Sequence, residues 1–385
     1  MPASSVPLRS LLTRAALVRL ALGWGAVAGL GLAAPLLAAP LPGPALAALL
    51  AAIVAVILLC AFGVVHEAEH LAHRLGDPYG SLVLTLSIVL IEVVLIAAVM
   101  LGPGEHATIA RDSVMAVSMI IMNLVVGLCL LLGGMRHGDL APHPTGASAY
   151  LAMITVLGSL GLAVPALLSG AGTLGTGQAV VVVVLTIGLY AFFLARQMGR
   201  QAADFREVDG PSADPEAPAQ EEPPASIGAV LAAHRREILG RFALLVATVL
   251  PIVLLSHDMA DLLDDGLARL GAPTALAGLV IAMIVFLPES ITAVRAALGG
   301  ELQRVLNLCH GALVSTVGLT IPVVLVIGMV TGQDVVLGET PIDLLLLGAT
   351  VMLSGIGLAG RRLGAMHGAA HLALFGVFAL TLLTA

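Results

Sequence analysis

The sequence contains no lysine, little charge of either sign and few aromatic residues. All 17 basic residues are arginine, charged residues make up 11% of the 385 positions, and aromatic residues make up 3%. Soluble domains carry about 25% charged residues, so this composition excludes a water-soluble enzyme with an ordinary surface. Three cysteines are too few for a disulfide scaffold. A hydrophobic content of 59% and a mean hydropathy of +1.07 instead predict a membrane protein.

Long apolar runs supply the membrane spans. A helix needs about 20 mostly apolar residues to cross a bilayer, and the chain offers about eleven such stretches. They cover residues 16–37, 44–65, 80–101, 113–133, 149–169, 178–195, 242–262, 274–294, 305–330, 342–359 and 365–384. The sequence therefore predicts an all-α polytopic membrane protein.

The arginines indicate the orientation, because positively charged loops stay in the cytoplasm during insertion. With the N-terminus inside, 15 of the 17 arginines fall on the cytoplasmic side, and only Arg111 and Arg269 fall outside. A wrong number of helices would scramble this partition. We therefore expect a multi-pass protein of the cell inner membrane, with a cytoplasmic N-terminus and the C-terminus outside.

A short acidic segment divides the chain into two halves. Residues 204–225 hold seven acids, five prolines and one arginine, a composition that cannot bury apolar area and predicts a disordered cytoplasmic tether. The predicted parts are an N-terminal helix (1–40), a first five-helix repeat (41–196), an acidic linker (197–238) and a second five-helix repeat (239–385).

The halves share an order of landmarks. Each has a histidine-acid pair, then an apolar helix with one glutamate, then a helix with a Val-Gly-Leu motif. The pairs are His66-Glu67 and His257-Asp258, and the glutamates are Glu92 and Glu289. Because five spans is an odd number, the second copy enters the membrane from the opposite side, which predicts inverted-topology repeats. In transporters of this build the substrate lies near the midplane, at the repeat interface.

Glu92 and Glu289 are the only acids well inside the predicted spans. A carboxylate in hydrocarbon costs about 3 kcal/mol even on lenient scales, so a symmetric pair points to function. Two carboxylates can neutralise one Ca²⁺, which takes about six to eight oxygen ligands. An empty, desolvated pair would also take up protons readily, so cation and protons compete for the same oxygens. Together with alternating access, this competition is sufficient for cation/proton exchange.

Other polar groups would complete such a site. Pro288 removes a backbone donor beside Glu289 and frees a carbonyl at the same depth. The candidate supporting ligands are Ser87, Ser118, Asn123, Pro288, Asn307 and Ser315. The candidate proton relay or gate consists of His66, Glu67, His257 and Asp258, since imidazole titrates near neutral pH, and the alternative is that these residues are only polar helix ends.

The run LGDPYGSLVLTLSIVLIEV at 75–93 resembles the first repeat of bacterial calcium/proton and sodium-potassium/proton antiporters of the cation exchanger superfamily. Further similar segments are Arg111-Asp112, Pro288-Glu289-Ser290, residues 302–308, residues 318–322 and residues 367–375. The resemblance runs from about residue 60 to the C-terminus, with a break at the linker. It implies a sodium/calcium exchanger-like fold of one helix plus two inverted five-helix repeats, in which Glu92 and Glu289 carry the cation and the protons.

This resemblance also implies what the protein binds. The chain is expected to be a transporter without enzymatic activity or a cofactor, and to export Ca²⁺, with Na⁺ and K⁺ as further candidates, in exchange for protons. Its expected partners are inorganic cations, protons and the lipid bilayer, without nucleic acid, and it is either a monomer or a homo-oligomer.

Two rival functions remain open on the sequence. His66-Glu67-Ala68-Glu69-His70 is a literal H-E-x-x-H, which on a helix can bind zinc, so the chain could be an intramembrane zinc metalloprotease with a third ligand from Asp264 or Asp265. The second half lacks the second histidine, which favours a polar helix end. A passive channel is the third class, and the symmetric carboxylates count against it.

Overall fold

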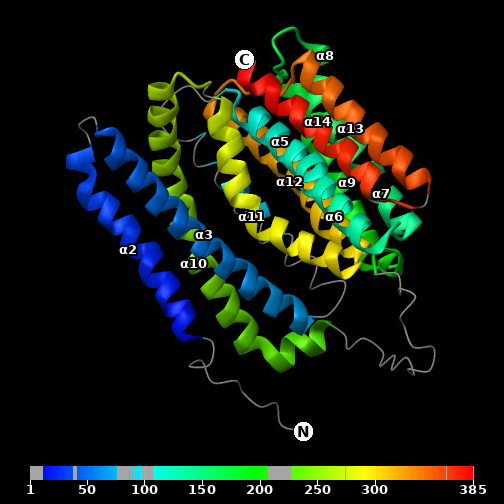
Figure 1. Ribbon diagram of the computed structural model, residues 1–385, viewed down its shortest axis with the longest axis horizontal. Helices are drawn as coiled ribbons and strands as arrows, with labels where there is room; N and C mark the ends of the chain where they lie inside the picture. Colours follow the sequence, from blue (N-terminus) through cyan, green and yellow to red (C-terminus); the bar gives the residue numbers. More distant parts are fainter. Residues whose placement is uncertain are drawn as a thin grey trace. The chain divides into compact units, whose positions relative to one another are not determined.

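A computed structural model describes most of the chain (Figure 1). The described residues are 12–37, 41–75, 86, 89–90, 92–94, 96–97, 100, 107–206, 227–273, 275–360 and 362–384. Within these ranges the chain is helical and its only β-structure is two isolated bridges. Nine of the described helices are long and apolar enough to cross a membrane, and up to ten if a bent helix is counted. The all-α membrane class is confirmed, whereas the count of eleven stays a prediction because most of the predicted span 80–101 lies outside the described residues.

The chain divides into two compact units, and each unit takes residues from both halves of the sequence. The first unit consists of residues 1–88 and 209–262, and the second of residues 89–208 and 263–385. The predicted boundaries at the linker therefore describe the sequence repeats, and the compact units cut across them.

The first unit contains three long helices. They are α2 (Arg14–Leu37), α3 (Gly43–Leu75) and most of α10 (Ile227–Leu270). Helices α2 and α3 pack side by side (Figure 1). The predicted first span is thus a complete helix of this unit.

A close approach at Gly23 of α2 holds this unit together. A side chain at Gly23 would collide with Cys60 of α3 and Pro251 of α10. One residue on, the Trp24 indole Nε1 donates to the Ala247 carbonyl at 3.1 Å. Small residues at such crossings let membrane helices pack closely, so α2 contacts both α3 and α10 at this point.

The second unit contains the remaining helices. They are α5 (Ile109–Met119), η1 (Ile120–Val125), α6 (Val126–His137), α7 (Pro144–Gly158), η2 (Ser159–Ala163), α8 (Val164–Leu168), α9 (Thr176–Met198), η3 (Ala202–Phe205), α11 (Ala275–Gly299), α12 (Leu302–Thr331), α13 (Pro341–Ala359) and α14 (Ala365–Thr384). The π-helical turns η1 and η2 interrupt two spans that are otherwise continuous, 109–137 and 144–168.

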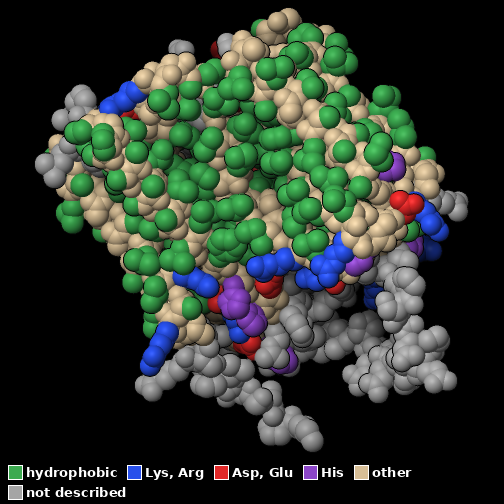
Figure 2. All heavy atoms as spheres, in the orientation of Figure 1, with side chains coloured by type: hydrophobic (Ala, Val, Ile, Leu, Met, Phe, Trp, Pro, Cys, Tyr) green, Lys and Arg blue, Asp and Glu red, His purple; other side chains and the backbone are tan. Residues whose placement is uncertain are grey.

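Helix α9 shows why these elements belong in a bilayer. Its buried residues recur every three or four positions, at Ala179, Val182, Thr186, Tyr190 and Phe193. Large apolar residues nevertheless occupy its exposed face, at Val180, Val181, Val184, Leu185 and Phe192. Apolar side chains also cover much of the face drawn in Figure 2. A helix that is apolar on both its buried and its exposed face is typical of a membrane span, where the exposed face contacts lipid.

The innermost spans of the second unit are α5–η1–α6 and α12, which are the two most buried spans of the described chain. They occupy equivalent positions in the two predicted repeats. Helix α14 packs on α6 where Gly127 faces Gly368, and a side chain on Gly368 would collide with the α6 backbone at Gly127 and Leu131. Each repeat therefore contributes one helix to the centre of this unit.

The start of the acidic linker is more ordered than the sequence predicts. Phe205 is buried, and its ring packs against those of Tyr150 and Phe193 at centroid distances of 5.2 and 5.8 Å. The Phe205 carbonyl also accepts a 2.6 Å hydrogen bond from Asn307. The predicted tether was therefore placed too early, because one aromatic side chain and one partly buried amide hold 204–206 against the helices; residues 207–225 lie outside the described residues.

Candidate functional site

The two intramembrane glutamates lie in the second unit and interact electrostatically. Glu92 is only 4% exposed, and the negative charges of Glu92 and Glu289 are close enough to influence each other. Glu92 Oε1 and Glu289 Oε2 are both buried without a hydrogen-bond partner among the described residues. No arginine of the described chain forms an ion pair with either carboxylate. The structure thus brings together the two acids that the repeat singled out.

Helix α12 supplies a hydroxyl to this pair. The Thr316 hydroxyl donates to Glu92 Oε2 at 2.6 Å, and both groups are buried. Cys309, seven residues earlier and so on the same face of α12, is an electrostatic neighbour of Glu289. One face of α12 therefore runs past both carboxylates.

Thr316 was missed by the sequence reasoning, which chose Ser315 instead. The Ser315 hydroxyl faces another helix, where it accepts a 2.9 Å hydrogen bond from Tyr190. A usable signal was present, since Thr316 and Thr320 are four residues apart and share a helix face. The Thr320 hydroxyl is also buried without a partner among the described residues.

A bend in α11 positions Glu289. The helix turns by 54° between its Gly278–Ile284 and Phe286–Gly299 parts. Proline clashes with the carbonyl four residues before it, and Pro288 minus four is Ile284, so the break falls where the proline predicts it. Glu289 follows directly after Pro288, just beyond this break. The Pro288 carbonyl, however, accepts a 3.1 Å hydrogen bond from Thr292.

The other candidate ligands are engaged elsewhere. Ser87 lies outside the described residues. The Ser118 hydroxyl donates to the Val114 carbonyl at 2.6 Å within its own helix. Asn307 donates to the Phe205 carbonyl and accepts from Gln303 at 2.9 Å, so its amide joins helix α12 to the start of the linker.

Asn123 joins three helices from within the π-turn η1. Its amide nitrogen donates to Thr350 of α13 at 2.8 Å, and its amide oxygen lies 3.0 Å from His371 Nδ1 of α14. All three side chains are buried. Since π-turns shift the side chains that follow them, the turn aims this amide at α13 and α14. His371 is accordingly a hydrogen-bonded core histidine, whereas both ring nitrogens of buried His310 have no partner among the described residues.

The H-E-x-x-H motif does not have the geometry of a zinc site. The imidazoles of His66 and His70 lie on one face of α3, with ring centroids 4.6 Å apart. Glu67, which would have to act as the base, instead pairs with Arg241 at 2.7 Å. Among the described residues, no group of three His, Cys, Asp or Glu side chains can hold a metal ion.

The second histidine-acid pair lies on α10, far along that helix from the point where the first pair contacts it. His257 is exposed and lies 4.0 Å from Asp261, and Asp258 is half-buried. Arg241, the partner of Glu67, precedes His257 by sixteen residues, which is about 24 Å along a helix. The four candidate relay residues therefore form two separate places near opposite ends of the spans.

Comparisons with known proteins agree with this architecture. Residues 45–199 and 241–384 match the family described as "Sodium/calcium exchanger protein". The chain is 38% identical over 322 residues to "Putative ionic transporter y4hA" of Sinorhizobium fredii, covering 83% of this chain and 84% of the relative. It is 32% identical to "Sodium-potassium/proton antiporter ChaA" of Escherichia coli, covering 85% and 86%.

A solved structure shares the fold. The structure of native YfkE aligns with a TM-score of 0.64 at 16% identity, and the alignment covers 94% of this chain and 99% of that one. The first matched segment, 45–199, includes Glu92 and the second, 241–384, includes Glu289, and nothing in these comparisons points to a protease. On its sequence and its fold, this chain belongs to the sodium/calcium exchanger family of membrane transporters.

Proposed function

We propose that this protein is a cation/proton antiporter that exports Ca²⁺, with Na⁺ or K⁺ as further cargo, in exchange for protons. The observation that carries the proposal is the buried pair of Glu92 and Glu289, whose oxygens include two without partners among the described residues. Membership of the exchanger family and the similarity to a sodium-potassium/proton antiporter support the same activity.

The chemistry follows from the lack of a fixed counter-charge. A buried carboxylate without an arginine has to be neutralised by a mobile cation or by a proton. The Thr316 hydroxyl can donate to ionised Glu92, and its oxygen can also turn a lone pair toward a bound cation. Cation and protons then exclude each other from one set of oxygens. Alternate opening of this site to the two sides would couple the two fluxes.

The contacts between loops support the proposed topology. On one side, Leu140 bridges Leu363, and the His143 backbone amide donates to Gln303 Oε1 at 2.8 Å. All three connections involved are predicted to be cytoplasmic. On the other side, Thr173 bridges Val336, and both connections are predicted to lie outside. The bridges among described loops join only loops assigned to the same side, as the proposed order of spans requires.

The test is exchange in proteoliposomes with an imposed pH gradient. Ca²⁺, Na⁺ and K⁺ are added in turn, and collapse of the gradient is followed with a pH-sensitive dye. We expect gradient collapse with wild-type protein for at least one cation, and none with Glu92→Gln or Glu289→Gln. Glu301→Gln is the matched control, since Glu301 is a partly exposed carboxylate paired with Arg304 at 2.9 Å.

Two results would count against the proposal. Normal exchange by both intramembrane variants would remove the carboxylates from the mechanism. Cation flux that proceeds without proton movement, and that ignores the imposed gradient, would indicate a passive channel instead.

A further inference from the structure

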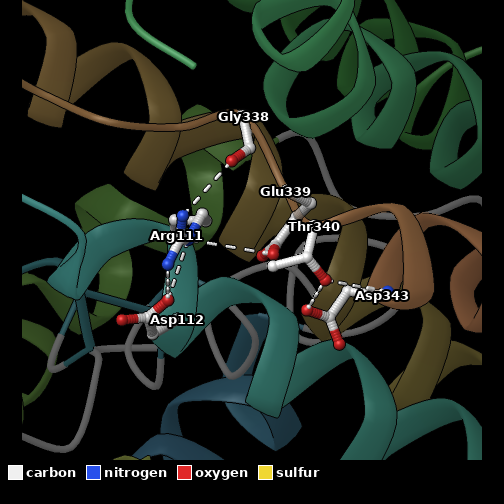
Figure 3. A network of polar contacts seen from close by, with 6 residues as sticks. All are labelled: Arg111, Asp112, Gly338, Glu339, Thr340 and Asp343. Atoms are coloured by element: carbon white, nitrogen blue, oxygen red, sulfur yellow. Dashed lines mark hydrogen bonds and ion pairs between the residues drawn. The ribbon is translucent and has the colours of Figure 1, made fainter. Parts of the chain in front are cut away.

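A second set of charged groups lies where the connection between α12 and α13 meets the start of α5 (Figure 3). Arg111 Nε donates to Asp112 Oδ1 at 2.8 Å, and Arg111 Nη1 donates to the Gly338 carbonyl at 3.4 Å. Arg111 Nε also lies 3.8 Å from Glu339 Oε2. One guanidinium is thus shared between two carboxylates, and it sits closer to the exposed one.

Glu339 is the buried member of this set. Its side chain is 2% exposed, whereas that of Asp112 is 53% exposed. Glu339 Oε1 has no hydrogen-bond partner among the described residues. Burial, together with the negative charges of Asp343 and Asp112, raises the pKa of Glu339 to about 8, and the positive charge of Arg111 opposes this rise.

Among the described residues, the charged groups that act on Glu339 come from two elements. Arg111 and Asp112 face it from α5, and Asp343 faces it from the first turn of α13. The connection between α8 and α9, residues 169–175, also lies against this segment, and it contains no titratable residue. The group of this region whose pKa burial raises is Glu339.

The segment that carries Glu339 ties several elements together. The Val336 amide donates to the Ala107 carbonyl at 2.9 Å, just before α5, and the Gly338 amide donates to the Gly172 carbonyl at 2.9 Å. The Glu339 amide donates to the Leu162 carbonyl of η2 at 3.2 Å. Movement of this segment would therefore strain its hydrogen bonds to the residue before α5, to η2 and to the α8–α9 connection.

We propose that Glu339 is a proton-binding site separate from Glu92 and Glu289, and that loss of its proton draws Arg111 away from Asp112 and toward Glu339. An exposed ion pair such as Arg111 with Asp112 is worth little, whereas an ionised buried carboxylate needs a counter-charge. The charge on Glu339 thus decides where the guanidinium lies. In the proposed topology the junction faces the outside, so that it responds to external pH.

The test is thermal unfolding of the purified full-length protein between pH 5.5 and 9.5, for wild type and Glu339→Gln. The pKa of Glu339 is about 8 in the folded protein and about 4.3 when unfolded. Its contribution to stability is therefore greatest at low pH and falls as the pH rises toward 8. We expect the unfolding temperature of Glu339→Gln to rise relative to wild type up to about pH 8 and to level off above it.

Two further variants locate the titration. Arg111→Gln removes the positive charge that favours ionisation of Glu339, so the fall of the unfolding temperature with pH should continue to a higher pH than in wild type. Asp343→Asn removes a negative charge that opposes ionisation, so the unfolding temperature should level off at a lower pH. These two profiles also carry the test if Glu339→Gln fails to fold. Glu301→Gln is the control and should stay parallel to wild type at every pH.

Parallel curves for Glu339→Gln and wild type across the whole range would overturn the proposal, as would a levelling pH that neither Arg111→Gln nor Asp343→Asn moves. The measurement requires no transport, so its failure is distinguishable from a failure of the antiport mechanism.

Discussion

Two buried carboxylates of this protein, Glu67 in the first unit and Glu92 in the second, differ in what faces the charge. The Glu67 side chain is 6% exposed and pairs with Arg241 at 2.7 Å, and Arg241 also contacts Glu237 at 3.3 Å. Glu92 is equally buried, but its one described hydrogen-bond partner is the Thr316 hydroxyl. The first charge is permanently compensated, whereas the second has to be compensated by something that can leave.

This difference separates structure from transport. An arginine guanidinium stays charged at every physiological pH, so a carboxylate beside it gains little from a cation or a proton. A carboxylate beside a hydroxyl can exchange both. Burial alone therefore does not mark a transport residue; burial without a basic partner does.

The largest effect should follow from neutralising the unpaired acids. Glu92→Gln or Glu289→Gln removes a charged ligand from a dehydrated cation, and we expect exchange to fall by about a hundredfold or more. The initial rate of exchange in proteoliposomes measures this. An unchanged amount of folded, monodisperse protein should accompany the loss, and a variant that still exchanges at the wild-type rate would contradict the comparison.

Neutralising the paired acid should instead affect stability. Glu67→Gln leaves Arg241 with one fewer counter-charge, and we expect a loss of about 1–3 kcal/mol in the free energy of unfolding. Thermal unfolding in detergent reports the loss. Exchange per folded molecule should be close to wild type, and Glu69→Gln, an exposed acid on the same helix, serves as control. If Glu67→Gln abolished exchange in a fully stable protein, Glu67 would belong with the transport residues.

A smaller effect is expected from the hydroxyl that faces Glu92. Thr316→Val keeps the shape of the side chain and removes one hydrogen bond to a charged group, worth about 1.5–3 kcal/mol. We expect the cation concentration for half-maximal exchange to change by about tenfold or more. Thr155→Val is the control, because the Thr155 hydroxyl is exposed and bonds only to its own helix. Equal behaviour of the two variants would remove Thr316 from the site.

The smallest effect should come from an exposed ion pair. Asp265 and Arg269 lie one helical turn apart and contact each other at 2.6 Å, and both side chains are partly exposed. Asp265→Asn should change the free energy of unfolding by less than about 0.5 kcal/mol and leave exchange intact. A change as large as that of Glu67→Gln would mean that exposure does not weaken ion pairs in this protein.

The sequence predicted much of the fold because a membrane helix satisfies its own backbone and has to be apolar over a fixed length. The described helices α2, α9, α12, α13 and α14 lie close to predicted spans. The bend beside Glu289 was also predictable, since proline acts on the helix that contains it. The π-turns in η1 and η2 were not, because they arise from packing against other helices.

What the sequence alone determined is the class of protein, the approximate spans and the two intramembrane glutamates, all of which follow from local composition and from the repeat. Only the tertiary structure decided which polar groups meet. It paired Glu67 with Arg241, directed Asn123 toward Thr350 and His371, and placed Thr316 against Glu92. These contacts join residues far apart in the chain, and the free energy of a buried charge depends on such neighbours rather than on the residues beside it in sequence.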